Sequence, residues 1–292
     1  MEILEEKVKV LVEALPYIKK FTGKTFVIKF GGSIMENEEA KAAFIEDIVL
    51  MKLIGINLII IHGGGPKISE NLKDLGIESN FINGLRVTNR ETMKVVEMVL
   101  AGYINKEIVF KINDQGVKAI GISGKDGGFI RARKKYIYNE DGKVDLGFVG
   151  EVEEIKVEFL EDLIEKGYIP VVAPTGFDKD GNSYNINADY VASSISFTLK
   201  AEKLILLTDV EGLYRDINDK STFISQLTKG EARQLISTGI INGGMLPKIE
   251  CCISAIENGT KNIHMIDGRK KHCLLLEIFT DTGIGTMIRE GA

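Results

Sequence analysis

The sequence lacks the long apolar runs that a membrane-spanning chain needs. Its longest runs, such as 58–61 and 204–207, are far below the roughly 18 residues of a spanning helix. Residues 1–6 also lack the basic region of a secretion signal, so we expect a cytoplasmic protein. Dense Lys/Arg stretches are absent, and the formal net charge is −5. No general surface for nucleic acid or anionic lipid is therefore predicted, and any phosphate binding must be local.

Cysteine and proline are both scarce. The three cysteines, of which Cys251 and Cys252 are adjacent, fit neither a disulfide framework nor a zinc spacing, so we expect burial and no protein-bound metal. The five prolines are isolated, and no Pro/Ser-rich linker divides the chain. With 44% hydrophobic and 27% charged residues, the 292 residues are typical of a globular protein with one large domain or two abutting lobes.

Apolar segments alternate with helical patterns along most of the chain. The predicted strands are 25–30, 57–62, 117–122, 169–173, 203–208 and 262–266. The predicted helices are 38–54, one from residue 66, 90–114, 157–166, 188–200, 229–238 and 247–257, followed by a short helix and strand. Residues 129–155 are charged and turn-rich, which predicts a hairpin insertion. This alternation predicts an α/β protein with a mostly parallel sheet covered on both faces.

Residues 3–20 predict an N-terminal helix, which Pro16 is expected to kink. One side of this helix carries an apolar stripe made of Leu4, Val8, Leu11, Leu15 and Ile18. Nothing adjacent in the sequence would cover the stripe, so we expect it to form an interface.

Two common phosphate-binding signatures are nearly present but fail. Gly23-Lys24-Thr25 ends like a Walker A loop, yet Ile18 stands where the first glycine is required. Gly63-x-Gly65 begins like a dinucleotide fingerprint, yet Ile68 stands at the third glycine position.

Two glycine clusters instead follow two consecutive predicted strands: Gly31-Gly32-Ser33 and Gly63-Gly64-Gly65-Pro66. Neighbouring strand ends would place them side by side, where their N–H groups could cradle a polyphosphate. Lys29 is the next-to-last residue of the first strand. It would direct its charge at a phosphate, or else face water at a sheet edge.

Four further segments carry candidate residues. Lys248 follows a Gly-Gly turn at the start of a helix, where a cation opposes the helix dipole, so it would direct its charge at a phosphate or else be a solvated lysine of the first turn. Asp189 could orient two lysines, although Asn187 or Asp189 could simply cap the helix that starts there. Arg86 has the planar fork that matches a carboxylate, or is a surface arginine. Residues 208–212 lie at a strand exit and could contact a nucleotide or form a plain turn.

As a set, these segments resemble the N-acetylglutamate kinases, a branch of the amino-acid kinase family. The resemblance runs in order from about residue 24 to 290. Its motifs are Lys29-Phe30-Gly31-Gly32-Ser33, His62-Gly63-Gly64-Gly65-Pro66, Gly84-Leu85-Arg86-Val87-Thr88, Tyr184-Asn185-Ile186-Asn187-Ala188-Asp189, Leu207-Thr208-Asp209-Val210-Glu211-Gly212 and Gly243-Gly244-Met245-Leu246-Pro247-Lys248. The first and fifth occur throughout the family, whereas the second, third and fourth point to N-acetylglutamate.

The resemblance implies a three-layer αβα sandwich with an N-terminal oligomerisation helix (1–22), an acceptor lobe (23–175) and a nucleotide lobe (176–292). The implied reaction transfers a phosphoryl group from ATP to the side-chain carboxylate of N-acetyl-L-glutamate, in arginine biosynthesis. Mg²⁺ would be held by the ATP phosphates. The acceptor is already ionised at pH 7, so no general base is needed.

The resemblance also implies residue roles. The implied catalytic residues are Lys29, Lys248 and Asp189; the acceptor contacts are Gly64, Gly65, Arg86 and Asn185; the phosphate and nucleotide contacts are Gly31, Gly32, Thr208, Asp209 and Gly212. It further implies a homo-hexamer, built as a trimer of dimers joined by the N-terminal helix, and inhibition by L-arginine. The implied arginine contacts are Tyr17, Lys203, His264, Glu277 and Gly283.

Three other functions stay open at this point. The chain could be another kinase of this family, acting on aspartate, glutamate, carbamate or uridylate. It could be an inactive arginine-binding sensor, although the intact Lys29, Lys248 and Asp189 argue against this. A nicotinamide-dependent oxidoreductase is disfavoured by the missing third glycine.

Overall fold

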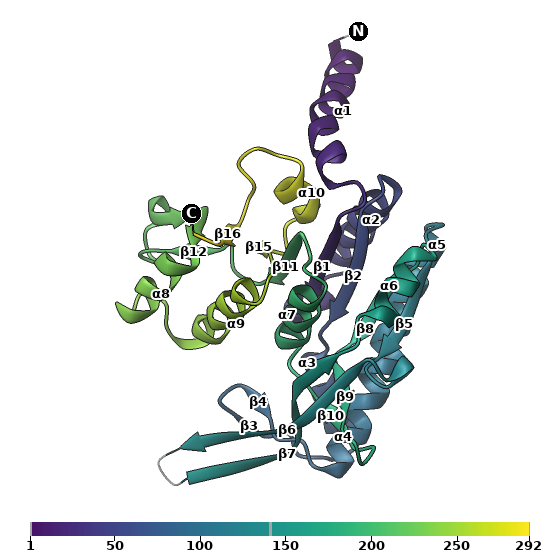
Figure 1. Ribbon diagram of the computed structural model, residues 1–292, viewed down its shortest axis with the longest axis vertical. Coiled ribbons are helices and arrows are strands. Elements are labelled where there is room, and N and C mark those ends of the chain that lie inside the picture. Colours follow the sequence, from purple (N-terminus) through teal and green to yellow (C-terminus); the bar gives the residue numbers. More distant parts are fainter. Residues whose placement is uncertain (1, 140–141, 292) are drawn as a thin grey trace.

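The computed structural model of the chain describes residues 2–139 and 142–291. An eight-stranded sheet forms its centre, in the order β14-β16-β15-β11-β1-β2-β8-β5 (Figure 1). The six strands from β15 to β5 are parallel, β16 is antiparallel to β15, and β14 pairs parallel with β16. The strands are β1 (Thr25–Phe30), β2 (Asn57–His62), β5 (Ala119–Ser123), β8 (Ile169–Ala173), β11 (Lys203–Thr208), β14 (Gln226–Thr228), β15 (Asn262–Asp267) and β16 (Thr286–Arg289). The prediction of a mostly parallel sheet is confirmed.

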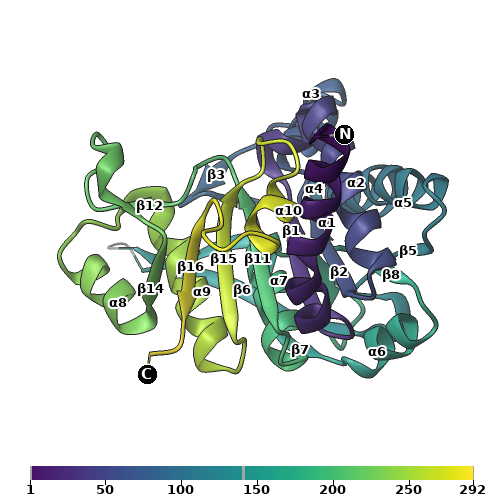
Figure 2. The same cartoon turned by 90° about the horizontal axis from the view of Figure 1, so that it is seen from above.

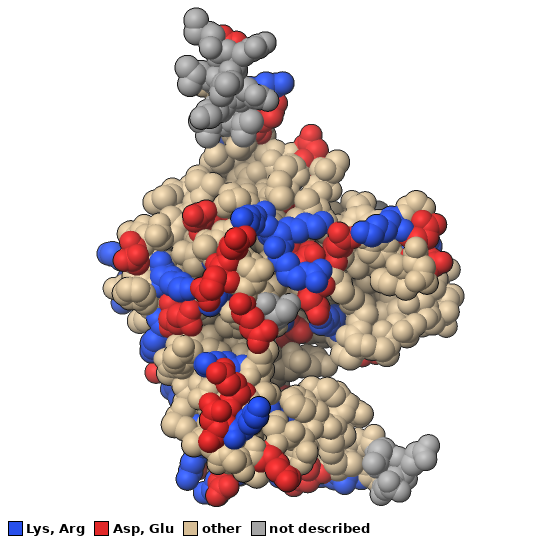
Figure 3. Space-filling view, turned by 180° about the vertical axis from the view of Figure 1, so that it is seen from behind, with Lys and Arg blue, Asp and Glu red and all other residues tan. Residues whose placement is uncertain are grey.

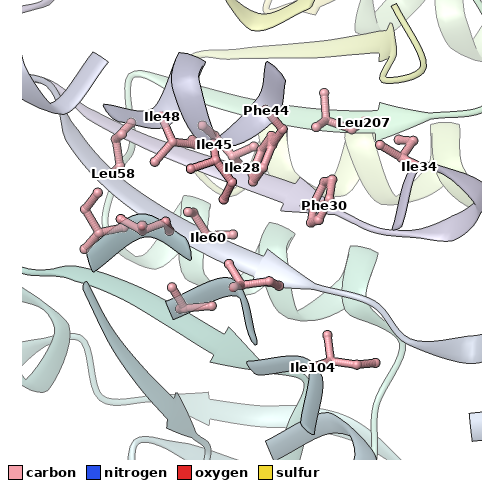
Figure 4. Packing of buried hydrophobic residues seen from close by; sticks show 14 of the residues in the cluster. Ile28, Phe30, Ile34, Phe44, Ile45, Ile48, Leu58, Ile60, Ile104 and Leu207 are labelled. Carbon is pink, nitrogen blue, oxygen red and sulfur yellow. The ribbon is translucent and has the colours of Figure 1, made fainter. Parts of the chain in front are cut away.

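Helices cover both faces of the sheet (Figure 2). Side chains alternate along β1, so Ile28 and Phe30 pack into one core and Val27 into the other (Figure 4). The first core lies under α2 (Glu38–Leu53), α3 (Gly65–Asp74), α4 (Arg90–Glu97), α5 (Asn105–Asp114) and α10 (Cys273–Ile278). The second lies under α6 (Glu158–Glu165), α7 (Ala188–Thr198), α8 (Lys229–Ser237) and α9 (Leu246–Glu257). Because both faces are covered, the inner strands are continuous apolar runs.

The helices predicted near 90–114 are present as α4 and α5, and a π-helical segment, η2 (Met98–Ile104), lies between them. The N–H of Asn105 donates to the carbonyl of Leu100, five residues earlier, which is the π-helical hydrogen bond. The apolar pattern of the sequence did not predict this widened turn. Segments of this kind are frequent at functional sites.

A small closed barrel lies beside the sheet. The hairpin predicted over 129–155 is present as β6 (Ile130–Asn139) and β7 (Gly142–Ile155), and it projects from the body in Figure 1. It closes with two short strands, β9 (Thr175–Phe177) and β10 (Ser183–Asn185). Two further pairs are β3 (Phe81–Ile82) with β4 (Leu85–Arg86), and β12 (Leu213–Tyr214) with β13 (Phe223–Ile224).

The predicted N-terminal helix is α1 (Glu2–Phe21), which continues through Pro16 and extends away from the body (Figure 1). On this single chain, Val8 and Leu15 are 59% and 46% exposed. The side chains of Leu4 and Leu11 lie outside the part that the structure describes. The described part of the apolar stripe is therefore exposed at Val8 and Leu15 and half-buried at Ile18.

Surface charges of both signs are interspersed over the face shown in Figure 3. Within residues 2–139 and 142–291, no helix is both long enough and apolar enough to cross a membrane.

Candidate active site

The two glycine turns meet at the carboxyl ends of β1 and β2. The N–H of Gly63 donates to the carbonyl of Phe30 at 2.7 Å. A Cβ atom on Gly31 would lie 3.2 Å from both Cα and N of Gly63, so a side chain would force the turns apart. The turns lie side by side, as neighbouring parallel strands require.

Lys29 and Asp189 form an ion pair beside these turns. Lys29 lies on the same face of β1 as Val27, which α7 covers, and its Nζ is 3.0 Å from Oδ1 of Asp189. Their side chains are only 14% and 13% exposed. Asn187 is the N-cap of α7, because its side chain accepts the N–H of Asp189 at 2.8 Å. Asn187 thus caps the helix, and the carboxylate of Asp189 is left to hold Lys29.

Lys248 lies in the first turn of α9, which packs along α7. Cys251 joins the two helices, because its Sγ is 2.8 Å from Oγ of Ser193 and 3.5 Å from the carbonyl of Asp189. Burial raises the pKa of Cys251 to about 12, so the thiol stays protonated and able to donate. Ser196 near the end of α7 and Thr260 just past α9 are joined by a hydrogen bond of 2.9 Å, so the two helices run in the same direction. Lys248 therefore lies at the end of α9 nearest Asp189.

Arg86 is buried and links the β3–β4 hairpin to the start of α3. Its Nη2 donates to the carbonyl of Gly65 at 3.0 Å and to Oγ of Ser69 at 2.8 Å, and its Nη1 donates to Ser79. The ring centre of Phe81 is 4.5 Å from the guanidinium carbon. Burial lowers the pKa of Arg86 from its ordinary value. The predicted carboxylate clamp therefore lies directly against the second glycine turn.

Asn185, at the end of β10, is connected to Arg86 through the side chain of Thr88, for which the sequence predicted no role. Its Nδ2 is 3.4 Å from Oγ1 of Thr88, and that hydroxyl donates to the carbonyl of Arg86 at 2.8 Å. The acceptor candidates Gly65, Arg86 and Asn185 are thus joined by one chain of hydrogen bonds.

The nucleotide candidates lie at the same edge of the sheet, on the next strand. Leu206 pairs with Lys29, so Thr208 continues past the end of β1. The hydroxyl of Thr208 donates to the carbonyl of Val210 at 2.9 Å, and Asp209 is exposed. Gly212 has a φ of 150°, and a Cβ atom there would lie 2.5 Å from Oγ1 of Thr286. The turn from Thr208 to Gly212 therefore requires glycine at its last position.

Two polar residues that were given no role lie directly behind the glycine turns. His62, the last residue of β2, and Asn105, which follows the π-helical segment, are both fully buried and are 3.2 Å apart. The sequence feature that could have indicated His62 is a histidine at the end of a mostly apolar strand.

The arginine candidates form a second cluster, toward the amino ends of the strands. Nζ of Lys203 is 2.7 Å from Nε2 of His264, whose Nδ1 is 2.6 Å from Oε1 of Glu277. Oε2 of Glu277 accepts the N–H groups of Ile284 and Gly285 at 2.7 and 3.0 Å. Burial lowers the pKa of Lys203 to about 8 and also lowers that of His264. Burial alone would raise the pKa of Glu277, but these hydrogen bonds hold it below its ordinary value.

Tyr17 and Gly283 complete the cluster. The hydroxyl of Tyr17 in α1 donates to Asp281, and its ring packs edge-on against Phe279 with centres 6.3 Å apart. Gly283 has a φ of 62°, and a Cβ atom there would lie 2.7 Å from Oε2 of Glu277. Four of the arginine candidates, from β11, β15, α10 and the loop after α10, are therefore in contact, and Tyr17 of α1 packs on the segment between Glu277 and Gly283.

Comparison with known proteins shows the family to which the chain is similar. The family model described as Amino acid kinase family matches residues 24–267. An acetylglutamate kinase of Thermoanaerobacter pseudethanolicus is 57% identical over 282 residues, which cover 97% of this chain and 93% of the relative. An acetylglutamate kinase of Carboxydothermus hydrogenoformans is 55% identical over 292 residues, which cover 99% of each chain.

Solved structures agree on the fold. The N-acetylglutamate synthase of Neisseria gonorrhoeae, complexed with coenzyme A and N-acetyl-glutamate, superposes with a TM-score of 0.84 at 26% identity. That match covers 98% of this chain, which spans 64% of the length of the synthase. A carbamate kinase from Giardia lamblia bound to AMP-PNP has a TM-score of 0.64 at 17% identity, over 92% of this chain and 99% of that one. The chain belongs to the amino-acid kinase family.

Proposed function

We propose that the protein uses ATP to phosphorylate the side-chain carboxylate of N-acetyl-L-glutamate, giving ADP and N-acetyl-L-glutamyl 5-phosphate in arginine biosynthesis. The observation that carries this proposal is the Lys29–Asp189 pair beside two glycine turns that touch. Relatives that share 54–57% of their residues with nearly the whole chain are named acetylglutamate kinase, which supports this acceptor.

The chemistry needs charge and alignment rather than proton transfer. A carboxylate oxygen of the acceptor forms a bond to the γ-phosphorus of ATP, while the bond from that phosphorus to the oxygen shared with the β-phosphate breaks. The acceptor is already an anion, so no base is required. Lys29 and Lys248 neutralise charge on the transferring group from the acceptor and nucleotide sides. Asp189 holds the Nζ of Lys29 in place, at 3.0 Å from its Oδ1.

Backbone and side-chain donors complete the proposed site. The N–H groups of Gly31, Gly32 and Gly64 donate to phosphoryl oxygens, and Gly64, Gly65, Arg86 and Asn185 hold the acceptor. Thr208, Asp209 and Gly212 contact the nucleotide. In this proposal the acceptor lobe is 23–175 and the nucleotide lobe 176–292, with Asn185 just past their junction.

Mg²⁺ fits this site as an ion carried by ATP. When bound with ATP, it would supply positive charge to the phosphates, and phosphate and water oxygens are its preferred ligands. The carboxylate of Asp189, beside the turns, is already paired with Lys29. This pairing favours a metal held by the phosphates over one held by a protein cage.

A coupled assay of ADP release tests the proposed function. Its acceptor panel should hold N-acetyl-L-glutamate, L-glutamate, L-aspartate, carbamate and uridylate, each with ATP and Mg²⁺. We expect rapid turnover with N-acetyl-L-glutamate alone, and a Lys29→Met variant should fold and be inactive. Preference for any other acceptor would assign the chain to a different branch of the family.

We also infer that the second cluster binds L-arginine as an inhibitor. Arginine carries a cationic side chain, a carboxylate and an ammonium group, and the cluster offers buried groups of both signs in Glu277 and Lys203. The structurally similar N-acetylglutamate synthase of Neisseria gonorrhoeae was solved complexed with coenzyme A and L-arginine, at a TM-score of 0.81 and 26% identity, over 98% of this chain and 66% of the synthase.

The exposed stripe of α1 supports a homo-hexamer in which this helix joins three dimers. Deleting residues 1–20 removes both the stripe and Tyr17, so we expect an active dimer with little arginine sensitivity. Light scattering and an arginine titration test the two parts separately. A truncated protein that stays hexameric would contradict the assembly, and full inhibition would contradict the regulatory role of α1.

A further inference from the structure

A buried histidine precedes the second glycine turn and touches it. The ring of His62 is fully buried at the end of β2. Its Nδ1 is 2.9 Å from the carbonyl oxygen of Gly63, and its Nε2 is 3.2 Å from Nδ2 of Asn105. No step of the proposed reaction uses this ring as an acid or base. Its contacts instead connect the turn to the π-helical segment.

The hydrogen bonds around the ring determine where its proton lies. Lys106 donates to Oδ1 of Asn105 at 3.2 Å, so Nδ2 of Asn105 faces His62 and also donates to the carbonyl of Val171 at 2.8 Å. An amide nitrogen only donates, so Nε2 of His62 must accept. The neutral ring then carries its proton on Nδ1 and donates it to Gly63. Burial lowers the pKa of His62 to about 4, which keeps the ring neutral near pH 7.

The peptide that receives this hydrogen bond also carries a proposed phosphoryl contact. The carbonyl of Gly63 and the N–H of Gly64 belong to one planar peptide and point in opposite directions. Two glycines restrain such a peptide weakly, because neither has a Cβ atom. Among the hydrogen bonds of the described residues, the N–H of Gly64 finds no acceptor. A donor on the carbonyl side is therefore what keeps this N–H in one direction.

The surrounding elements are shaped to keep His62 and Asn105 in contact. A Cβ atom on Gly64 would lie 2.6 Å from side-chain atoms of both Leu100 and Ile104, so the π-helical segment packs directly against the turn. In β5, a Cβ atom on Gly121 would lie 1.8 Å from Oδ1 of Asn105. Glycine within a strand is otherwise unfavourable, and here it makes room for the amide.

We propose that His62 is a positioning residue for phosphoryl transfer: its Nδ1–H fixes the Gly63–Gly64 peptide so that the N–H of Gly64 points at the transferring group. Asn105 acts one step further back, by selecting the tautomer. The identity of the transferring group rests on the proposed function. The hydrogen-bond chain itself rests on the structure alone.

Two substitutions at position 62 distinguish the contribution of Nδ1 from that of Nε2. The amide nitrogen of asparagine lies near the position of Nδ1, and that of glutamine lies near the position of Nε2. We expect His62→Asn to keep the donor to Gly63 and to retain kcat within about threefold of the parent. We expect His62→Gln to lose it and to lower kcat by about 10- to 100-fold, with both KM values within about threefold, because the lost interaction belongs to the transition state.

The outcome can contradict the proposal in two ways. Equal losses of kcat, or a larger loss in His62→Asn, would show that Nδ1 does not position the turn. So would losses of kcat that simply follow the thermal unfolding midpoints of the two variants, since a purely structural role would give that result.

A spectroscopic measurement covers the case in which neither variant folds. The chain has three histidines, so nitrogen NMR of the parent protein with labelled histidine resolves few signals. The signal of the ring that does not titrate until about pH 4 should show the proton on Nδ1. A buried ring with its proton on Nε2, or one charged at pH 7, would overturn the proposal. A parent protein with this tautomer but no carboxylate kinase activity would contradict the proposed function instead.

Discussion

Charged side chains are arranged differently at the carboxyl ends and the amino ends of the parallel strands. At the carboxyl ends, one ion pair, Lys29–Asp189, lies beside turns that have almost no side chains. Toward the amino ends, Lys203, His264 and Glu277 form a continuous chain, and the side chains of His264 and Glu277 are each 4% exposed. The first arrangement keeps positive charge and backbone donors available to an anionic ligand. The second satisfies most of its charge internally, so it depends on every member being present.

This difference predicts opposite consequences when a charge is removed. A charge at the carboxyl ends should matter for the reaction and little for folding. A charge in the amino-end cluster should matter for folding, because its loss leaves a buried partner without compensation.

The largest effect is expected at Glu277, which holds His264 and two backbone N–H groups. Replacing Glu277 with alanine should lower the free energy of unfolding by about 3–5 kcal/mol, because Lys203 and His264 stay buried without an acid. Denaturant titration measures this, and arginine inhibition should weaken in parallel. The control is Glu257→Ala, which removes an exposed partner of Arg233 and should cost at most about 1 kcal/mol. Equal losses in the two variants would contradict the contrast.

The second effect concerns Lys248. Lys248→Ala should lower kcat by about 10²–10³-fold while the unfolding free energy changes little, because a charge placed for the transition state is lost. Lys229 is a matched control, since it also lies in the first turn of a helix but pairs with Glu290 outside the site. Lys229→Ala should keep parental kcat. Turnover of Lys248→Ala within a factor of about three of the parent would remove Lys248 from the mechanism.

The carboxyl-end site could be predicted from the sequence, whereas the amino-end cluster could not. Residues at strand exits are read from local pattern: an apolar strand, a glycine turn and a helix start predicted the place of Lys29, and the pairing of neighbouring parallel strands brings its turn against Gly63. Lys203, His264 and Glu277 are far apart in the chain, and no spacing joins them. Their proximity was implied only by resemblance to a known family.

Some elements of the fold could likewise be predicted from the sequence and others could not. Long apolar runs such as 25–30 and 203–208 match β1 and β11, because burial on both faces leaves a continuous signal. Strands of two or three residues, such as β3 and β9, are too short for an alternating pattern to be recognised. The π-helical segment at 98–104 has no distinct apolar spacing, so the contact between Asn105 and His62 could not be predicted.

The third effect is a dependence of stability on pH. The pKa of His62 is about 4 when folded and near 6.5 when unfolded, so below pH 6.5 the unfolded chain binds a proton that the folded chain does not. Stability from this residue is complete above pH 6.5 and is lost as pH falls toward 4, by roughly 3 kcal/mol. Denaturant titrations between pH 4 and 7 measure the free energy of unfolding of both proteins. Between these two pH values it should fall by roughly 3 kcal/mol less in His62→Asn than in the parent. His264 is present in both proteins, so its own contribution cancels, and parallel pH curves would contradict the assigned pKa.

The smallest effect is expected at Arg86, the proposed contact to the acceptor at the carboxyl ends of the strands. Lysine keeps the charge of Arg86 but cannot hold Gly65, Ser69 and Ser79 together while also binding a carboxylate. Arg86→Lys should therefore raise KM for N-acetyl-L-glutamate by about tenfold and KM for ATP much less, measured by initial rates with one substrate saturating. Arg133→Lys is the control, since Arg133 is an exposed arginine on β6 paired with Glu151, and both of its KM values should stay parental. If Arg86→Lys raised the two KM values equally, Arg86 would support the glycine turns as a whole rather than the acceptor, and the acceptor carboxylate would need another partner.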